Sequence, residues 1–126
     1  MLRNSTGITV AGKGAASEPP QGEIRYVSAI TLNELLGPFE KVDYLESDIQ
    51  ESEKLVFPPF VDLLKRKVRR IHIGTHGKQT HWTLHDLFAR KGWDIIFSYE
   101  PETVHDTVLE TFRTEDGVLT VRNTGL

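Results

Sequence analysis

Short runs of apolar residues alternate along this chain with polar stretches, and their spacing predicts strands and helices in turn. Apolar and polar residues alternate from Val42 to Ile49, which predicts a strand that leaves the core at Asp48. Helical spacing follows over 52–67, interrupted by two prolines, and indicates one kinked helix or two short ones. The other predicted elements are a helical turn over 32–36 capped by Thr31, a strand over 68–73 stopped by Gly74, a helix over 81–91 capped by Thr80 and ended by Gly92, and strands over 94–99 and 118–121.

The order of these elements predicts an α/β fold with parallel strands, a terminal antiparallel pair and flanking helices. Residues 102–112 fit either a helix or extended structure, and we interpret them as extended. Residues 1–23 are rich in glycine and proline and are expected to form a flexible arm, which leaves 24–126 as one folded domain. Ligands bind such sheets beyond the carboxyl ends of the strands, where Asp48 and the segment His72–His76 lie.

Composition limits the classes of function. The 126 residues carry 15 Lys plus Arg and 18 Asp plus Glu, so the net charge of −3 offers no general field for nucleic acid, and we expect no nucleic-acid binding. The basic run over 65–70 is expected to complement a helix end. Without cysteine, a disulfide and a thiolate nucleophile are excluded, and a metal would need histidine and carboxylates. No apolar stretch suits a signal peptide or a membrane span, which predicts a cytoplasmic protein with no membrane partner.

Two groups of residues suggest a specific chemistry that their spacing does not support. Residues 12–17 suggest a phosphate-binding loop, but no Ser or Thr follows Lys13, and the two prolines after it cannot open the required helix. Four histidines lie between 72 and 85, and His81 with His85 form an i, i+4 pair of the kind that binds zinc. The HExxH motif is absent, so we interpret both as exposed helix residues. A His-ligated metal protein remains an alternative.

Residues that follow the strand ends are the better candidates for a site. His76 is placed for a cleft, whereas His72 alternates with isoleucines and is expected to fill the less buried face of its strand. Carboxylates at Asp48, Glu51 and Glu53 follow a strand end, where they can bind a cofactor, a metal or a substrate hydroxyl. Glu51 and Glu53 equally suit the first turn of a helix, where the helix dipole stabilises them.

Three segments taken together resemble the C-terminal half of FkbM-type methyltransferases. They are Thr31-Leu32-Asn33-Glu34-Leu35-Leu36, the strand and turn Val42–Glu53, and Ile71-His72-Ile73-Gly74-Thr75-His76-Gly77. In that family a T-L-D-x-L-L segment precedes a strand that ends in D-x-E/Q-G-A/S-E, and a later strand ends in a short motif with His or Glu. The resemblance spans roughly Ile24 to Asn123.

The resemblance implies a partial Rossmann-like methyltransferase sheet and transfer of a methyl group from S-adenosylmethionine to a hydroxyl of a small molecule or sugar. By position, Asp48 and Glu53 match the family's acidic residues at the cofactor and substrate edge. His76 is expected to be the base or a substrate contact, with Asp48 orienting it or the substrate. Glu51 stands where the family has Gly, and Asn33 stands where it has Asp.

The cofactor loop of the family, a D-x-G-A-N-x-G-like segment, has no counterpart among the 126 residues. The resemblance therefore implies only the strands from the fourth onward, with an unpaired edge where the first strand would lie. One expectation is a methyltransferase that a partner chain, a second copy or further sequence completes. The other is a non-catalytic truncated module that forms a homo-oligomer or binds a partner chain through the exposed edge.

Overall fold

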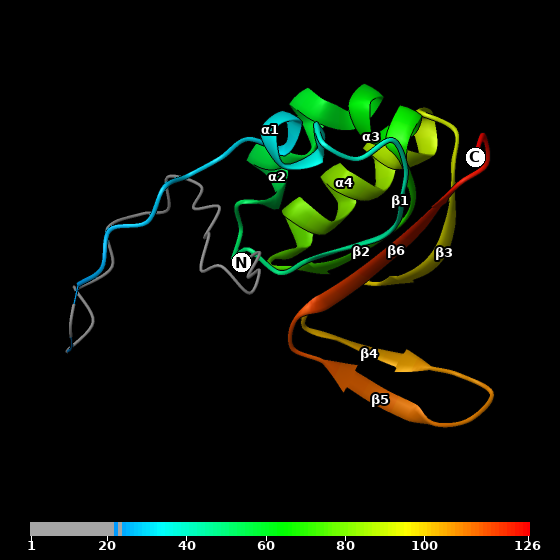
Figure 1. Cartoon of the computed structure of the whole chain (residues 1–126). Helices are drawn as coiled ribbons and strands as arrows, with labels where there is room; N and C mark the ends of the chain where they lie inside the picture. The colour runs from blue at the N-terminus through cyan, green and yellow to red at the C-terminus, as the bar shows by residue number, and fades with distance from the viewer. Residues whose placement is uncertain (1–21, 23) are drawn as a thin grey trace.

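The computed structural model of the protein describes residue 22 and residues 24–126. The arm expected over 1–23 and the stretch 12–17 lie outside these residues, apart from Gly22. The described chain forms an α/β fold in which a mixed sheet of parallel and antiparallel strands is combined with a few helices (Figure 1). The fold class predicted from the sequence is confirmed at this level.

The central sheet has four strands in the order β1-β2-β6-β3. β1 (Val42–Ser47) pairs in parallel with β2 (Val68–Thr75), and β6 (Gly117–Asn123) is antiparallel both to β2 and to β3 (Trp93–Tyr99). β1, β2 and β3 therefore run in one direction, and the last strand of the chain runs the opposite way between β2 and β3. The predicted terminal antiparallel pairing is present, but the last strand is inserted into the sheet instead of ending it.

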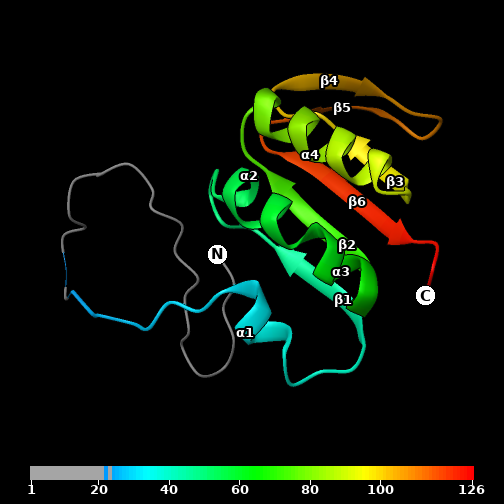
Figure 2. The same ribbon diagram turned by 90° about the horizontal axis from the view of Figure 1, so that it is seen from above.

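The helices lie on one side of this sheet (Figures 1 and 2). They are α1 (Leu32–Leu36), α2 (Glu53–Val56), the 3-10 turn η1 (Pro58–Phe60), α3 (Val61–Lys67) and α4 (Lys78–Arg90). The two prolines open η1, because the first positions of a helix need no backbone N–H donor. No helix in the described part of the chain has the length and apolar character needed to cross a membrane.

The core lies between the helices and the sheet. Residues that alternate along β2 and β6 point into it, and α4 supplies Leu84 and Phe88 from above. The Phe88 ring contacts Phe57 and Trp93 edge to face, with centroids 6.0 and 5.4 Å away. On the opposite face of the sheet, Tyr44 and Phe97 are 52 and 51% exposed, so the described helices cover only one face.

A separate hairpin extends from the end of the sheet (Figure 1). Its strands β4 (Thr103–Asp106) and β5 (Thr111–Thr114) are antiparallel. The ring of Phe112 lies 5.3 Å from that of Tyr99, which holds the hairpin against the end of β3. The interpretation of residues 102–112 as extended is confirmed.

The N-terminal cap of α1 agrees with the prediction from the sequence, whereas the start of α4 and the end of β2 differ from it. The Thr31 hydroxyl accepts a hydrogen bond from the Glu34 backbone N–H and caps α1 as predicted. α4 begins after Gly77, whose φ of 83° suits glycine, so Thr80 is a buried residue inside the helix and not its cap. β2 continues through Gly74, because Gly74 still pairs with β6.

Candidate functional site

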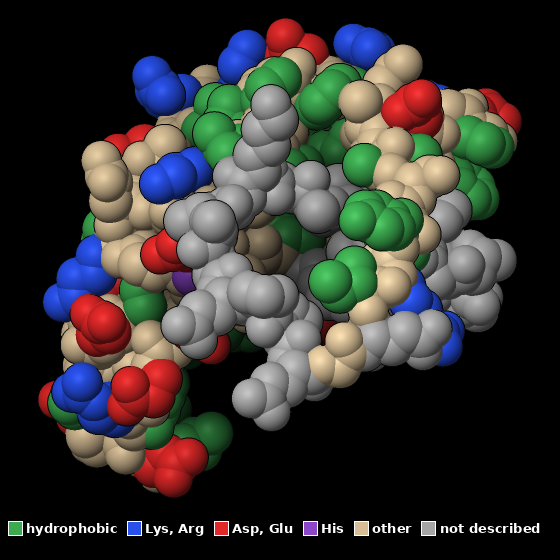
Figure 3. Space-filling view, turned by 90° about the vertical axis from the view of Figure 1, so that its left-hand side faces the viewer, with side chains coloured by type: hydrophobic (Ala, Val, Ile, Leu, Met, Phe, Trp, Pro, Cys, Tyr) green, Lys and Arg blue, Asp and Glu red, His purple; other side chains and the backbone are tan. Residues whose placement is uncertain are grey.

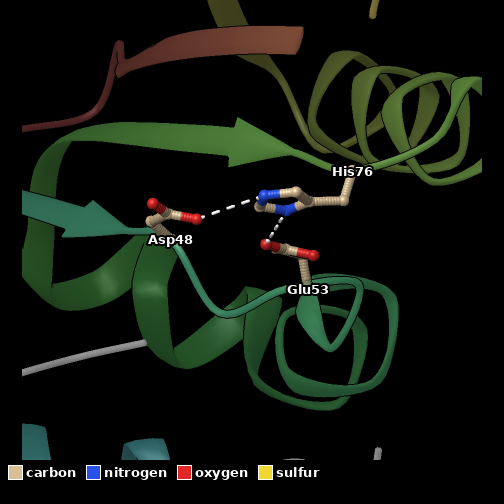
Figure 4. A group of neighbouring side chains, drawn as sticks. All are labelled: Asp48, Glu53 and His76. Carbon is tan, nitrogen blue, oxygen red and sulfur yellow. Dashed lines mark hydrogen bonds and ion pairs between the residues drawn. The ribbon is translucent and has the colours of Figure 1, made fainter. Parts of the chain in front are cut away.

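Asp48 and His76 meet at the carboxyl ends of two neighbouring parallel strands. Asp48 is the first residue after β1, and His76 is the first residue after β2. Because the two strands are adjacent and parallel, their ends lie at one edge of the sheet. The Asp48 Oδ1 atom lies 3.3 Å from His76 Nε2 (Figure 4). The expectation that both residues lie at carboxyl ends of strands is confirmed.

Glu53 approaches the imidazole of His76 from the other side. Its Oε1 atom lies 3.1 Å from His76 Nδ1 and accepts a hydrogen bond of 3.2 Å from the Ile49 backbone N–H. The Glu53 side chain is fully buried, and its Oε2 atom has no hydrogen-bond partner among the described residues. Burying a carboxylate is costly unless an opposite charge or a donor compensates it. The His76 imidazole is the side chain that supplies this compensation.

A tight turn carries the chain from Asp48 to Glu53. Gln50 and Glu51 have φ values of 53° and 68°, in the left-handed region that glycine adopts without strain. Glu51 is therefore a residue with a side chain in a backbone conformation that strains it. The turn brings Glu53 back beneath the strand end and under His76.

Asp116 is a further carboxylate near the imidazole, and the sequence analysis did not select it. Its Oδ2 atom lies 3.8 Å from His76 Nε2. Gly117 begins β6 and pairs with Thr75 at the end of β2, which places the preceding residue beside His76. The turn at 115–117 is evident in the sequence, but the strand with which the following β6 pairs is not. The pairing of β6 with β2 is the signal that identifies Asp116.

The two sides of the imidazole differ in access to solvent. The side chain of His76 is 10% exposed, and that of Glu53, at Nδ1, is 0% exposed. On the Nε2 side, the side chains of Asp48 and Asp116 are 64 and 71% exposed. A ligand therefore reaches the site from the Nε2 side. Glu53 contacts His76 from within the protein.

His81 is buried, which corrects the expectation of an exposed helix residue. Its Nδ1 lies 2.8 Å from the Thr75 hydroxyl and its Nε2 lies 2.9 Å from the Ser98 hydroxyl, so neighbouring strands satisfy both ring nitrogens. Burial, with a smaller contribution from the nearby His85, lowers the pKa of His81 to about 4. No ring nitrogen of His81 is left for a metal shared with His85. The i, i+4 pair therefore does not form the zinc-type arrangement that its spacing suggested.

His72 lies apart from the site on the less buried face of β2, as predicted, with its Nδ1 2.7 Å from the Thr120 hydroxyl.

The lysines of the basic run over 65–70 donate hydrogen bonds to carbonyl groups at or just beyond helix C-termini. Lys67 donates to the carbonyls of Leu36, the last residue of α1, and of Phe39 beyond it, and Lys65 donates to the carbonyl of Gly92 after α4. On the face shown in Figure 3, basic and acidic side chains are interspersed among the residues drawn in colour.

Asp48, Glu53 and His76 form a group that can hold a metal ion, since one ligand atom from each lies within 4.8 Å of the others. Comparisons with known proteins do not assign a role to this group: no family model, no curated protein and no solved structure matches the chain. The chemistry of the site is therefore argued from its residues and their geometry.

Proposed function

We propose that this chain is the acceptor-binding half of an S-adenosylmethionine-dependent O-methyltransferase of the FkbM type, acting on a hydroxyl of a small molecule or sugar. One observation carries the proposal: Asp48 and His76 lie 3.3 Å apart at the carboxyl ends of adjacent parallel strands. This edge of an α/β sheet is where ligands bind. The three segments that resemble the family include both strand ends.

The strand order of the sheet supports this proposal. Two parallel strands are followed in the sheet by the last strand of the chain, which runs antiparallel between β2 and β3. This order is similar to that of the C-terminal half of a Rossmann-like methyltransferase sheet. When the two strand orders are matched, β1 takes the place of the fourth strand of the methyltransferase sheet. Its outer edge has no strand partner among the described residues, which is where the first strand would pair.

The Asp48–His76 pair has the chemistry needed to bind an acceptor hydroxyl. Nδ1 of His76 is held by Glu53, so Nε2 is the ring nitrogen that faces the accessible side together with Asp48. A hydroxyl placed there would donate its hydrogen bond to the pair, which could then accept its proton. We assign the proton to the pair as a unit, because the imidazole and the carboxylate are in contact.

The residues present fit the acceptor side of a methyltransferase better than the cofactor side. No segment of the 126 residues is similar to the glycine loop of the family, and glycines are what allow backbone N–H groups to approach a cofactor. The exposed Asp48 carboxylate can accept a hydrogen bond from a cofactor hydroxyl or an acceptor hydroxyl, whereas Glu53 is buried. We therefore propose that the cofactor loop comes from a partner chain, a second copy or further sequence, and we derive no step through the cofactor.

A methyl-transfer assay tests the proposed function. The protein is isolated from its native cells with any bound polypeptide retained, and is given S-adenosylmethionine with a labelled methyl group and a panel of sugars and small alcohols. We expect acceptor-dependent incorporation of label, which His76→Ala reduces by about 10² to 10⁴-fold and His85→Ala leaves unchanged. Incorporation that is insensitive to His76→Ala, or no incorporation with any acceptor, contradicts the proposal.

A second candidate function is non-catalytic association through the β1 edge. An apolar groove of about 270 Å³ adjoins this edge and is lined by Leu35, Leu36, Phe39, Lys41, Val42 and Leu45. A strand from a second copy can pair with an open edge while its side chains fill such a groove. Sedimentation of the protein and of Phe39→Lys tests this function. A dimer that Phe39→Lys dissociates supports this function, provided that the control Phe97→Lys on the open face leaves the dimer intact. A protein that is monomeric at all concentrations contradicts this function.

A further inference from the structure

We infer that His76, Asp48 and Asp116 bind a first-row divalent metal ion, and that Glu53 orients the histidine from the buried side. The inference concerns the same edge of the sheet as the proposed function. It does not require methyl transfer, because metal binding is measurable without cofactor or acceptor. Its failure and the failure of the proposed function are therefore separate results.

The position of the imidazole between two carboxylates is the first reason for a cation. Glu53 Oε1 lies 3.1 Å from Nδ1, and Asp48 Oδ1 lies 3.3 Å from Nε2. A neutral imidazole has only one N–H, and ionised carboxylates only accept hydrogen bonds. One of the two contacts is therefore made by the ring N–H, and the other needs a second ring proton, a proton on the carboxyl group or a metal ion.

The buried Glu53 is an independent reason, and it determines which nitrogen binds the ion. Glu53 is fully buried, and its Oε2 atom has no hydrogen-bond partner among the described residues, so its charge lacks full compensation. An N–H at Nδ1 that donates to Glu53 leaves the Nε2 lone pair directed at Asp48. A carboxylate behind a metal-binding histidine fixes the tautomer and the ring orientation in this way.

Two donor atoms on the Nε2 side, from His76 and Asp48, are spaced for a metal ion, and Asp116 is the nearest further carboxylate on that side. Ligand nitrogen and oxygen atoms about 2.0 to 2.2 Å from a metal ion lie roughly 3 Å from each other. Nε2 of His76 is 3.3 Å from Asp48 Oδ1 and 3.8 Å from Asp116 Oδ2, and the exposed Asp116 side chain must move toward both of the other donors to complete the ligand set. Both aspartates are exposed, which leaves room for water or a hydroxyl as a further ligand.

The donor set favours particular ions. One imidazole nitrogen with two carboxylate oxygens suits Zn²⁺, Mn²⁺ and Fe²⁺, whereas Mg²⁺ and Ca²⁺ prefer oxygen ligands alone. An ion at this position would bind an acceptor hydroxyl directly and lower its pKa. With the ion bound, the Asp48–His76 pair acts as a set of ligands, and the ion supplies the activation that the pair would otherwise provide.

Calorimetric titration of tag-free protein with Zn²⁺ tests the inference. We expect one ion per chain and at least about 100-fold weaker binding of Mg²⁺. Glu53→Gln should weaken Zn²⁺ binding by about 10 to 100-fold without removing a ligand, and His76→Ala and Asp48→Asn should weaken it at least as much. His85→Ala is the matched control, because His85 is a partly exposed histidine on α4 outside the site, and its affinity should be unchanged. Absence of Zn²⁺ binding, or binding that is unchanged by His76→Ala, overturns the inference.

The ring nitrogens of His76 provide a second readout that does not rely on a destabilised variant. In a ¹H–¹⁵N spectrum of the histidine rings of the wild-type protein, Zn²⁺ should shift Nε2 of His76 and leave Nδ1 protonated. A His76 ring that keeps protons on both nitrogens when Zn²⁺ is added overturns the inference, since the second contact is then made by a second ring proton. A shift confined to Nδ1 overturns it as well, because Glu53 and not Asp48 would then share the ion.

Discussion

Nδ1 of His76 lies 3.1 Å from Oε1 of Glu53, although 23 residues separate the two along the chain. The contact joins the end of β2 to the first residue of α2. Removal of the imidazole leaves the fully buried Glu53 carboxylate without its side-chain partner, and among the described residues only the Ile49 backbone N–H still donates to it. We expect His76→Ala to lower the free energy of unfolding by about 3 kcal/mol, measured by urea denaturation at neutral pH.

A double variant shows whether the buried charge is the cause. Glu53→Gln should destabilise the wild-type protein, because it weakens the contact with His76 and with the Ile49 backbone N–H. In the His76→Ala background the same substitution should stabilise, by about 1 to 2 kcal/mol, since it removes an uncompensated charge. If Glu53→Gln destabilises both backgrounds equally, the two residues are not coupled and this account of the buried pair is wrong.

The stability of the protein should depend on pH through His81. Burial lowers the pKa of His81 to about 4 in the folded protein, against an ordinary value of 6.5. Between these values the unfolded chain binds more protons than the folded one, so the free energy of unfolding falls as the pH falls. From about pH 7 to about pH 5 we expect a loss of about 2 kcal/mol from this residue.

The variant His81→Asn isolates this contribution, because it removes the titrating group at the same buried position. Hydrogen bonds also lower the pKa of the Glu34 and Glu100 carboxyls, but these groups have an ordinary pKa of 4.5 and lose their contribution below the chosen range. In urea denaturation at both pH values, the free energy of unfolding of the variant should depend less on pH than that of the wild-type protein. An equal pH dependence in both proteins would show that His81 is not held neutral by burial.

The turn between β1 and α2 should become more stable when residue 51 is glycine. Glu51 has a φ of 68°, a left-handed conformation that costs a residue with a side chain about 1 to 2 kcal/mol. The gain on replacement by glycine is smaller than this cost, because glycine has more conformational freedom in the unfolded chain. We expect Glu51→Gly to raise the free energy of unfolding by about 0.5 to 1 kcal/mol. Lys54→Gly, three residues further on in α2, should lower it by about 1 kcal/mol. A loss of stability in both variants would show that position 51 is not strained.

The positions of Asp48 and His76 could be predicted from the sequence because strand alternation and the polar residues that follow it mark where a strand leaves the core. Their distance could not, since it depends on β1 and β2 being neighbours. The same local reasoning located β3 and β6 and the capped turn at Thr31. It could not show that β6 enters the sheet between β2 and β3, because antiparallel insertion is a property of long-range pairing.

The residues that sequence reasoning placed wrongly or missed depend on contacts between distant segments. His81 looked like an exposed partner of His85, but hydroxyls on β2 and β3 satisfy both its ring nitrogens and allow burial. Asp116 reaches the site only because β6 pairs with the end of β2. Helical spacing and turn motifs contain no information on either contact.

Binding of an acceptor at the Asp48–His76 edge is the central claim, and mapping by ¹H–¹⁵N NMR tests it most directly. The labelled protein is titrated with the panel of sugars and small alcohols, without cofactor. We expect at least one compound to shift the backbone amides of Asp48 and His76, with the shifts lost in Asp48→Asn and kept in Asp62→Asn, a similarly exposed aspartate on α3. If no compound shifts these amides, or if the shifts are unchanged in Asp48→Asn, the edge is not an acceptor site.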